Sequence, residues 1–534
     1  MNAKDILKSH DKLKTLRNPY ERDWKDVVTF VRPYGEDPTS KATPGDSRVD
    51  RIYDGTAPDA LEQLASGLQS FLVNPVDRWF EYGFGKTADI SAADRELALD
   101  WYEYAADAVY GVYSDDETGF NQSVNEVFLD CAGFGTGVMS QQWSDEIQKP
   151  FFRSHALATV WFKENSRGII TTAHLEVMMD REAAVDEFGE DALPAEWKSE
   201  DSTVYKVVNC VYPRKGGTYN AVAGKKPYAS VWIVEKFAHV LKESGYDSFP
   251  YHPSRWVKLS GEVYGRSPAT KCLPDIRLLN QMELCMIKAT QKIIDPPIMV
   301  DSDTTMLPLK SNPGAIWVME PMSTRPEPFM SGSNIPLTLD ILNQKRDFIR
   351  RCFHADWLQM EKAKLEMTAT EVMDRREEKL RLIAPVLGRQ QSEFLGPCVK
   401  RTLELLLTKG GLEAPPPIIK QMGLRIEYLS AAAKAQVGVK AMAMKRYAEE
   451  LLPFASVDPE ILLTLNMDEY ARYMAEFRSV PRKVLRSKEE VDGIKQAKQQ
   501  AQQMQQAVET ASVATQGLKN VAQAQSAGVE SGLA

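Results

Sequence analysis

The sequence predicts a mainly helical α+β protein, and three observations support that fold class. Apolar residues recur at helical spacing through most of the first 130 residues and again after about residue 268. Between Gly133 and about Val263, short runs rich in branched and aromatic residues are typical of strands. The 534 residues are 43% hydrophobic and 26% charged, which is ample for a core in about three to four domains.

In the first 130 residues we expect helices throughout. Apolar positions spaced three and four apart predict helices over 57–72 and 92–112, and a third over 120–132 follows the break at Gly119. The segment 31–54 is rich in Pro, Ser, Thr, Asp and Gly, so it is expected to be a long loop or arm.

The next region is expected to be a mixed α+β module. Strands are predicted over 138–143, 204–212 and 228–234, because these runs are rich in β-branched and aromatic residues. A short helix is predicted between strands over 181–188.

Two long helices are then predicted around a small insert. Residues 268–295 carry a narrow apolar stripe that Pro296-Pro297 ends sharply. A segment punctuated by Pro and Gly follows over 298–334, with strand-like runs at 298–300 and 315–318, and 335–354 is a second helix. An antiparallel helix pair with a capped tip is the simplest geometry.

The remaining chain is expected to be helical. Thr368 and Glu371 have capping-box spacing, so they predict the start of a helix that Pro385 and Pro397 must kink or break. Helix is predicted again over 425–477, with a break near Pro453. Beyond Ser487 the chain is rich in Gln and Ala, which favours either disorder or a helix that needs neighbours.

Charge and cysteine usage exclude several classes. The chain has 65 Lys+Arg against 74 Asp+Glu and a net charge of -9, unlike proteins that grip nucleic acid over their whole surface. The six cysteines form no CxxC or CxxH pair, which favours a reducing compartment and no structural zinc. The polar N-terminus and the lack of an 18-residue apolar run predict no signal peptide and no membrane span.

Motifs for catalysis are also missing. The glycines at 133, 135 and 137 lead from a helix into a strand without a following Lys-Ser/Thr, whereas phosphate loops need a strand first. No HExxH and no Gly-x-Ser-x-Gly occurs. We therefore expect no catalytic residue, no metal and no cofactor.

Basic residues cluster locally on the two long helices and just after them. The candidates for contact with phosphates are Lys288, Lys292, Lys345, Arg346, Lys362 and Lys364. Two interpretations stay open: a solvated, salt-bridged helix face, or a surface that faces passing phosphates.

Several segments resemble one family, the head–tail connector (portal) proteins of short-tailed, podovirus-type bacteriophages. The matching stretches are Gly261-Glu262-Val263-Tyr264-Gly265-Arg266-Ser267-Pro268, Asp295-Pro296-Pro297, and Thr368-Ala369-Thr370-Glu371-Val372 followed by Arg375 and Pro385. The resemblance covers about residues 15 to 480, and the tail is similar in composition alone.

The resemblance implies a portal fold that assembles as a ring, typically of twelve subunits, at one capsid vertex. The implied regions are a wing (1–266), stem helices (267–295 and 335–356), a clip (296–334), a channel loop (357–367), a long wing helix (368–414), a crown (415–486) and a barrel or disordered tail (487–534).

The implied function is a structural conduit for double-stranded DNA during packaging and ejection. The implied partners are copies of the same chain, the terminase motor, tail or adaptor proteins, and the major capsid and scaffolding proteins. The resemblance places the protein in the virion after assembly in the host cytoplasm, with the six basic residues above near the DNA. Two alternatives remain: a nucleic-acid-processing enzyme of the packaging machinery, or a generic oligomeric scaffold without a DNA role.

Overall fold

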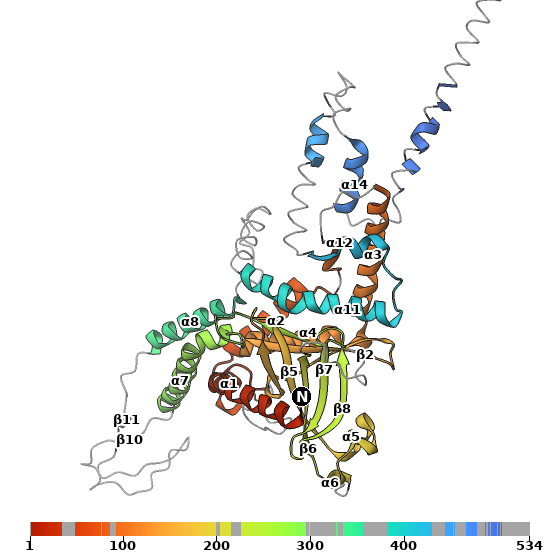
Figure 1. Ribbon diagram of the computed structural model, residues 1–534. Helices are drawn as coiled ribbons and strands as arrows, with labels where there is room; N and C mark the ends of the chain where they lie inside the picture. Colours follow the sequence, from red (N-terminus) through yellow and green to blue (C-terminus); the bar gives the residue numbers. More distant parts are fainter. Residues whose placement is uncertain are drawn as a thin grey trace, which may run out of the picture. The chain divides into compact units, whose positions relative to one another are not determined.

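The computed structural model divides into two compact units, residues 1–432 and 433–534, and each is described by itself. The residues that the structure describes are 2–34, 49–75, 77–85, 92–198, 203–214, 226–294, 298–299, 327–328, 335–355, 383–429, 444–451, 453, 466–477, 486, 490–491, 493–498, 500–501 and 503–504 (Figure 1). The channel loop, the capping box at Thr368, most of the clip and most of the tail lie outside these residues.

Helices dominate the start of the first unit, as predicted. They are α1 (Ala3–Phe30), α2 (Thr56–Leu72), α3 (Ala92–Ser114) and α4 (Phe120–Phe134), with 3₁₀ turns at Val49–Arg51 and Asp116–Thr118. Helix α4 is central, because Val124, Val127, Phe128 and Cys131 are all fully buried among the main core residues.

The α+β module contains two antiparallel sheets. The three-stranded sheet has the order β3-β2-β9, with β2 (Thr136–Ser144), β3 (Lys149–Ser154) and β9 (Tyr251–Arg255). The five-stranded sheet runs in chain order through β4 (Val160–Glu164), β5 (Ile170–Met179), β6 (Tyr205–Pro213), β7 (Tyr228–Val234) and β8 (His239–Tyr246). The mixed character that the sequence predicts is confirmed.

Helices cover both faces of the five-stranded sheet. Val208 of β6 packs in a cluster with Ile6 of α1, whereas the next residue toward the N-terminus, Val207, packs with Trp197. Successive strand residues point to opposite faces, so these two clusters lie on opposite sides. The second side holds the short helices α5 (Arg181–Phe188) and α6 (Ala195–Lys198).

One prediction for the first unit is wrong. Residues 80–84 and 425–428 were expected to be helical, but they lie in strands β1 (Phe80–Phe84) and β12 (Leu424–Tyr428), paired antiparallel. Both segments alternate larger apolar with polar or small residues, the two-residue period of a strand. Each strand satisfies its backbone with a partner more than 300 residues away, which local spacing does not reveal.

The expected break at Pro397 takes a different form. The chain is helical from 383 to 409, with a π-helical turn at Gln390–Leu395 inside it and α11 (Gly396–Lys409) after the turn; α12 (Pro417–Met422) follows a short loop. Gly396 donates its backbone N–H to the Gln391 carbonyl, which the Tyr428 hydroxyl also approaches at 2.7 Å. The wider turn lets the helix continue through a proline that has no N–H to donate.

The second unit is described in short helical pieces. Residues 444–451 are helical, α14 spans Met467–Phe477, and helical residues recur between 490 and 504. Lys495 forms an ion pair with Asp468 of α14. No helix in the described parts of either unit is long and apolar enough to cross a membrane.

Candidate functional site

The predicted pair of long helices is present as a hairpin. It consists of α7 (Pro268–Ile294) and α8 (Ile335–Cys352), which pack side by side (Figure 1). On α7 the buried stripe includes Cys272, Ile276 and Leu279, and α8 contributes Leu342 and Ile349. Between the helices, the short strands β10 (Ile298–Met299) and β11 (Glu327–Pro328) pair antiparallel.

The start of α7 is fixed by a hydroxyl cap. The Ser267 hydroxyl accepts a hydrogen bond from the Thr270 backbone N–H at 2.9 Å, and the Thr270 hydroxyl donates to the Ser267 carbonyl at 2.8 Å. With Pro268 at the first helical position, this sequence is a strong helix start. The Ser267-Pro268 part of the family motif therefore sets where α7 begins.

The preceding residues of the motif anchor this start in the core. Gly265 donates its N–H to the Thr136 hydroxyl at 2.8 Å, and its backbone crosses that of Gly135, which has φ +87°. A methyl group on Gly135 would lie 2.6 Å from the carbonyl carbon of Gly265. Tyr264 is buried and its hydroxyl accepts from the Phe162 N–H at 3.3 Å. Of the three glycines compared with a phosphate loop, Gly135 therefore serves close backbone packing. Gly137 does too, because a Cβ there would clash with the Val127 carbonyl oxygen.

Two of the predicted basic residues form ion pairs within the chain. The Lys345 ammonium lies 2.7 Å from an oxygen of Asp275 on α7. Arg346 Nε lies 2.8 Å from Asp54, and another guanidinium nitrogen contacts Glu283. The salt-bridged interpretation therefore describes these two side chains.

The other candidates are placed differently. Lys288 on α7 is exposed and has no ion pair among the described residues. Lys292 lies in the last turns of α7, and Lys362 and Lys364 fall outside the described residues.

A strap formed by residues 51–54 crosses the hairpin, and the sequence did not single it out. Asn280 of α7 accepts a hydrogen bond from the Tyr53 N–H at 2.7 Å and donates to the Arg51 carbonyl at 2.9 Å. Asp54 also accepts a hydrogen bond from the Thr56 N–H at 2.9 Å, just where α2 begins. Burial alone would raise the pKa of Asp54, but the bonds from Thr56 and Arg346 outweigh it and lower that pKa.

A buried arginine ties together the base of the hairpin and the sheets. Arg255 at the end of β9 is 2% exposed and pairs with Glu164 and, at 2.8 Å, with Glu393 of the π turn. It also donates to the Val263 carbonyl at 3.0 Å, just before the motif tyrosine. Nothing in the local sequence marks this arginine, because its two carboxylate partners are 138 and 91 residues away.

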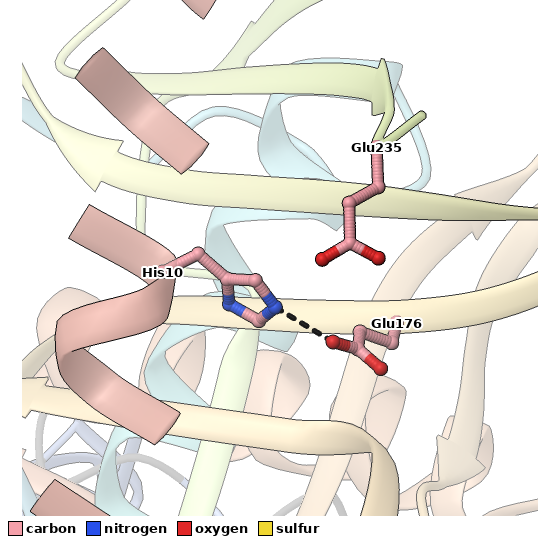
Figure 2. Close-up of side chains that lie close together, drawn as sticks. All are labelled: His10, Glu176 and Glu235. Atoms are coloured by element: carbon pink, nitrogen blue, oxygen red, sulfur yellow. Dashed lines mark hydrogen bonds and ion pairs between the residues drawn. The ribbon is translucent and has the colours of Figure 1, made fainter. Parts of the chain in front are cut away.

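One group of side chains has the composition of a metal site. His10, Glu176 and Glu235 present ligand atoms within 4.8 Å of one another (Figure 2). His10 Nε2 lies 2.7 Å from Glu176, while Lys14 lies 2.5 Å from Glu176 and 3.2 Å from Glu235. Lys206 contacts both carboxylates at 3.3 and 3.2 Å. Two ammonium groups thus neutralise the two carboxylates, so this is an ion-pair network that fastens α1 to the five-stranded sheet.

Comparisons with known proteins agree with the resemblance in the sequence. The family model described as "Bacteriophage head to tail connecting protein" matches residues 3–485. A protein of Salmonella phage epsilon15 described as "Portal protein" is 26% identical, over 97% of this chain and 95% of that protein. A "Probable portal protein" of Bordetella phage BPP-1 is 25% identical, over 89% of this chain and 87% of that protein. The family motif anchors the helix hairpin, and the family model matches most of the chain. The chain therefore belongs to the structural family of bacteriophage head-to-tail connecting proteins.

Proposed function

We propose that this chain forms a ring, typically of twelve copies, at one capsid vertex and serves as the conduit for DNA packaging and ejection. The α7–α8 hairpin is the stem of that ring and lines or backs the channel. The family match and the two portal relatives support this proposal. The terminase motor, tail or adaptor proteins and the capsid and scaffolding proteins would dock on the same ring, which assembles in the host cytoplasm.

The observation that carries the proposal is the apolar surface left on the hairpin. Large apolar side chains that are 38–46% exposed occur along both helices: Leu278, Ile287, Leu339, Ile341 and Phe348. The inner apolar stripes of α7 and α8 already pack against each other and against the core. Large apolar side chains that stay exposed along such a packed pair suit contact with a further protein surface. Neighbouring copies standing beside the hairpin would cover them.

The dimensions of such a ring suit a duplex. Helix axes pack about 8–10 Å apart, so a dozen inner helices enclose a circle about 34 Å across between axes. Subtracting one helix diameter of about 10 Å leaves a hole of about 20–30 Å.

The charge of the hairpin suits passage rather than tight binding. Helices α7 and α8 each carry four basic and two acidic residues, but Lys345 and Arg346 are occupied by Asp275, Asp54 and Glu283. Many unpaired cations would accumulate affinity through counterion release and hold DNA in place. Lys288, with Lys292, Lys362 and Lys364, would give sparse rings of charge, without base-specific readout.

Mass photometry and negative-stain microscopy of the purified chain test the ring. We expect particles of about twelve times the 60.0 kDa chain mass with a central hole. The pair of changes Ile341→Asp and Phe348→Asp should shift the particles toward monomers, because buried carboxylates would disrupt the interface. Leu97→Asp, at a 59% exposed leucine on α3, is the matched control and should leave rings intact. A wild-type chain that never forms rings at micromolar concentration would refute the proposal.

The DNA role needs a separate measurement. Lys288→Glu should reduce the DNA packaged per capsid, whereas Lys400→Glu, at an exposed lysine on α11, should not. Equal packaging by both variants would exclude Lys288 from the channel surface.

A further inference from the structure

The two faces of the five-stranded sheet carry segments of opposite charge. Helix α1 packs on one face, where Ile6 clusters with Val208 of β6. Residues 181–197, which include α5, pack on the other face, where Trp197 clusters with Val207. Figure 1 shows α1 and α5 on either side of the strands. The outward surfaces of the two segments therefore point away from each other, with the sheet between them.

The outward side of α1 is positively charged. Lys4, Lys8 and Lys12 follow one another at four-residue spacing, so they share one side of the helix, and we call these three residues the basic face. All three are exposed, and none forms an ion pair with another described residue. Over the whole helix, five basic residues are exposed against two acidic ones: Lys4, Lys8, Lys12, Arg22 and Lys25 against Asp5 and Asp11.

The segment on the other face of the sheet is negatively charged, and we call residues 181–197 the acidic lobe. Arg181 is the one basic residue in this segment, and it pairs with Glu190 at 3.1 Å. Within the part of the chain that the structure describes, Asp186, Glu187 and Asp191 form no ion pair. Six acidic residues of the lobe are exposed: Glu182, Asp186, Glu187, Glu190, Asp191 and Glu196.

This polarity favours one way of joining two copies. In a symmetric pair the same surface of both copies meets, so like charges would be opposed at a cost in free energy. In a head-to-tail pair the basic face meets the acidic lobe, and each copy keeps one charged surface for the next copy. Such contacts continue until a ring closes. The net charge of -9 keeps copies apart in orientations that lack this match.

We propose that the basic face of α1 docks on the acidic lobe of the neighbouring copy. The inference rests on the ring proposed above and adds a second contact to the apolar surface of the α7–α8 hairpin. Apolar burial supplies most of the binding free energy in such interfaces. The charged contact selects the head-to-tail orientation and speeds association, because complementary charges act mainly on specificity and on the rate of encounter.

Charge reversal on either surface tests this contact. In the first variant the basic face is reversed by Lys4→Glu, Lys8→Glu and Lys12→Glu. In the second variant the acidic lobe is reversed by Asp186→Lys, Glu187→Lys and Asp191→Lys. All six side chains are exposed, so both variants should fold, as circular dichroism can verify. Each variant alone opposes like charges, so mass photometry should show half-assembly at a concentration at least about tenfold higher than for the wild type.

Mixing the two variants distinguishes a contact between copies from an effect within one chain. When the variants alternate around a ring, each reversed basic face meets a reversed acidic lobe, and the unchanged surfaces meet as well. A ring with an even number of copies, such as twelve, can alternate throughout. We therefore expect the equimolar mixture to form rings at the wild-type concentration, with a central hole in negative-stain images.

A control variant makes the same change in net charge elsewhere, at exposed residues of α11 and β12: Lys400→Glu, Lys409→Glu and Arg425→Glu. It should assemble like the wild type. The inference is overturned if reversal of the basic face raises the assembly concentration no more than this control does. It is also overturned if the mixture of folded variants stays unassembled.

These failures are distinct from failure of the proposed function. In both of them the wild-type chain still forms rings, so the conduit remains and only the charged contact is lost. Unchanged rings that package less DNA after reversal of the basic face would assign that face to DNA instead. A wild-type chain that never forms rings refutes the proposed function and this contact together.

Discussion

Replacing Arg346 by glutamine decides between a structural role and a DNA-facing role for this arginine. The side chain keeps its apolar stem in Arg346→Gln, but it loses the charge that holds Asp54 and Glu283. These carboxylates are 6% and 14% exposed, so water cannot easily replace the guanidinium. The strap before α2 would lose its strongest attachment to α8.

The expected cost follows from the number and burial of these contacts. Hydrogen bonds to charged groups contribute about 1.5–3 kcal/mol, and a stranded carboxylate adds a desolvation penalty. Because the arginine itself is 27% exposed, we expect a loss of about 2–3 kcal/mol in the free energy of unfolding. Adding Asp54→Asn to Arg346→Gln removes one of the two stranded charges and should show a coupling energy of about 1–2 kcal/mol in a double-mutant cycle.

Tryptophan fluorescence during urea unfolding measures this effect selectively. All ten tryptophans precede residue 433, so the signal reports on the first unit. Arg350→Gln is the matched control one turn further along α8, because Arg350 and Asp347 are 45% and 66% exposed and 3.4 Å apart. Such an exposed pair contributes about 0–1 kcal/mol.

All variants should be compared in the same assembly state. If Arg346→Gln unfolds at the same urea concentration as Arg350→Gln but packages less DNA, the structural reasoning fails and the arginine acts on the channel.

Three further predictions concern packing and pH. Gly135→Ala should prevent accumulation of folded protein. Gly410→Ala, at φ +82° with nothing near its Cβ position, should lower the free energy of unfolding by about 1 kcal/mol. Soluble yield and thermal melting distinguish the two variants. The pKa of Glu176 is lowered to about 2, since the bonds from His10 and Lys14 and the charge of Lys206 outweigh burial. Its stabilising effect is therefore full above about pH 4.5 and is lost as the pH falls toward 2, and Glu176→Gln should flatten the acid-unfolding curve there. Burial lowers the pKa of His252 to about 3, so the stability that goes with its neutral form is full above pH 6.5 and declines as the pH falls below 6.5. His252→Gln should therefore reduce the slope of the free energy of unfolding against pH between pH 6.5 and 3. Equal slopes in the variant and the wild type would contradict the assignment.

Local patterns placed most helices and strands correctly because each segment has to bury one face. The apolar spacing in 57–72 predicts α2, and 228–234 coincides with β7. The helix predicted over 181–188 matches α5, whose start Asp180 caps by accepting the Ala183 N–H at 2.9 Å. In these segments the sequence spacing and the tertiary burial agree.

The candidate site was only partly predictable. The sequence identified the two long helices and the basic residues on them, and the family motif pointed to the base of α7. It did not show that Arg346 would be held by Asp54, because the two residues are almost 300 positions apart. Arg255 was missed for the same reason, since its carboxylate partners lie on β4 and the π turn.

The sequence by itself determined the α+β class, the helix hairpin and, through its motifs, the connector family. The tertiary structure alone decided that β1 pairs with β12, that Pro397 follows a π turn, and that Asp54 holds Arg346. The physical reason is that periodicity records which face of a segment is buried, whereas the partner across that face depends on where distant segments pack.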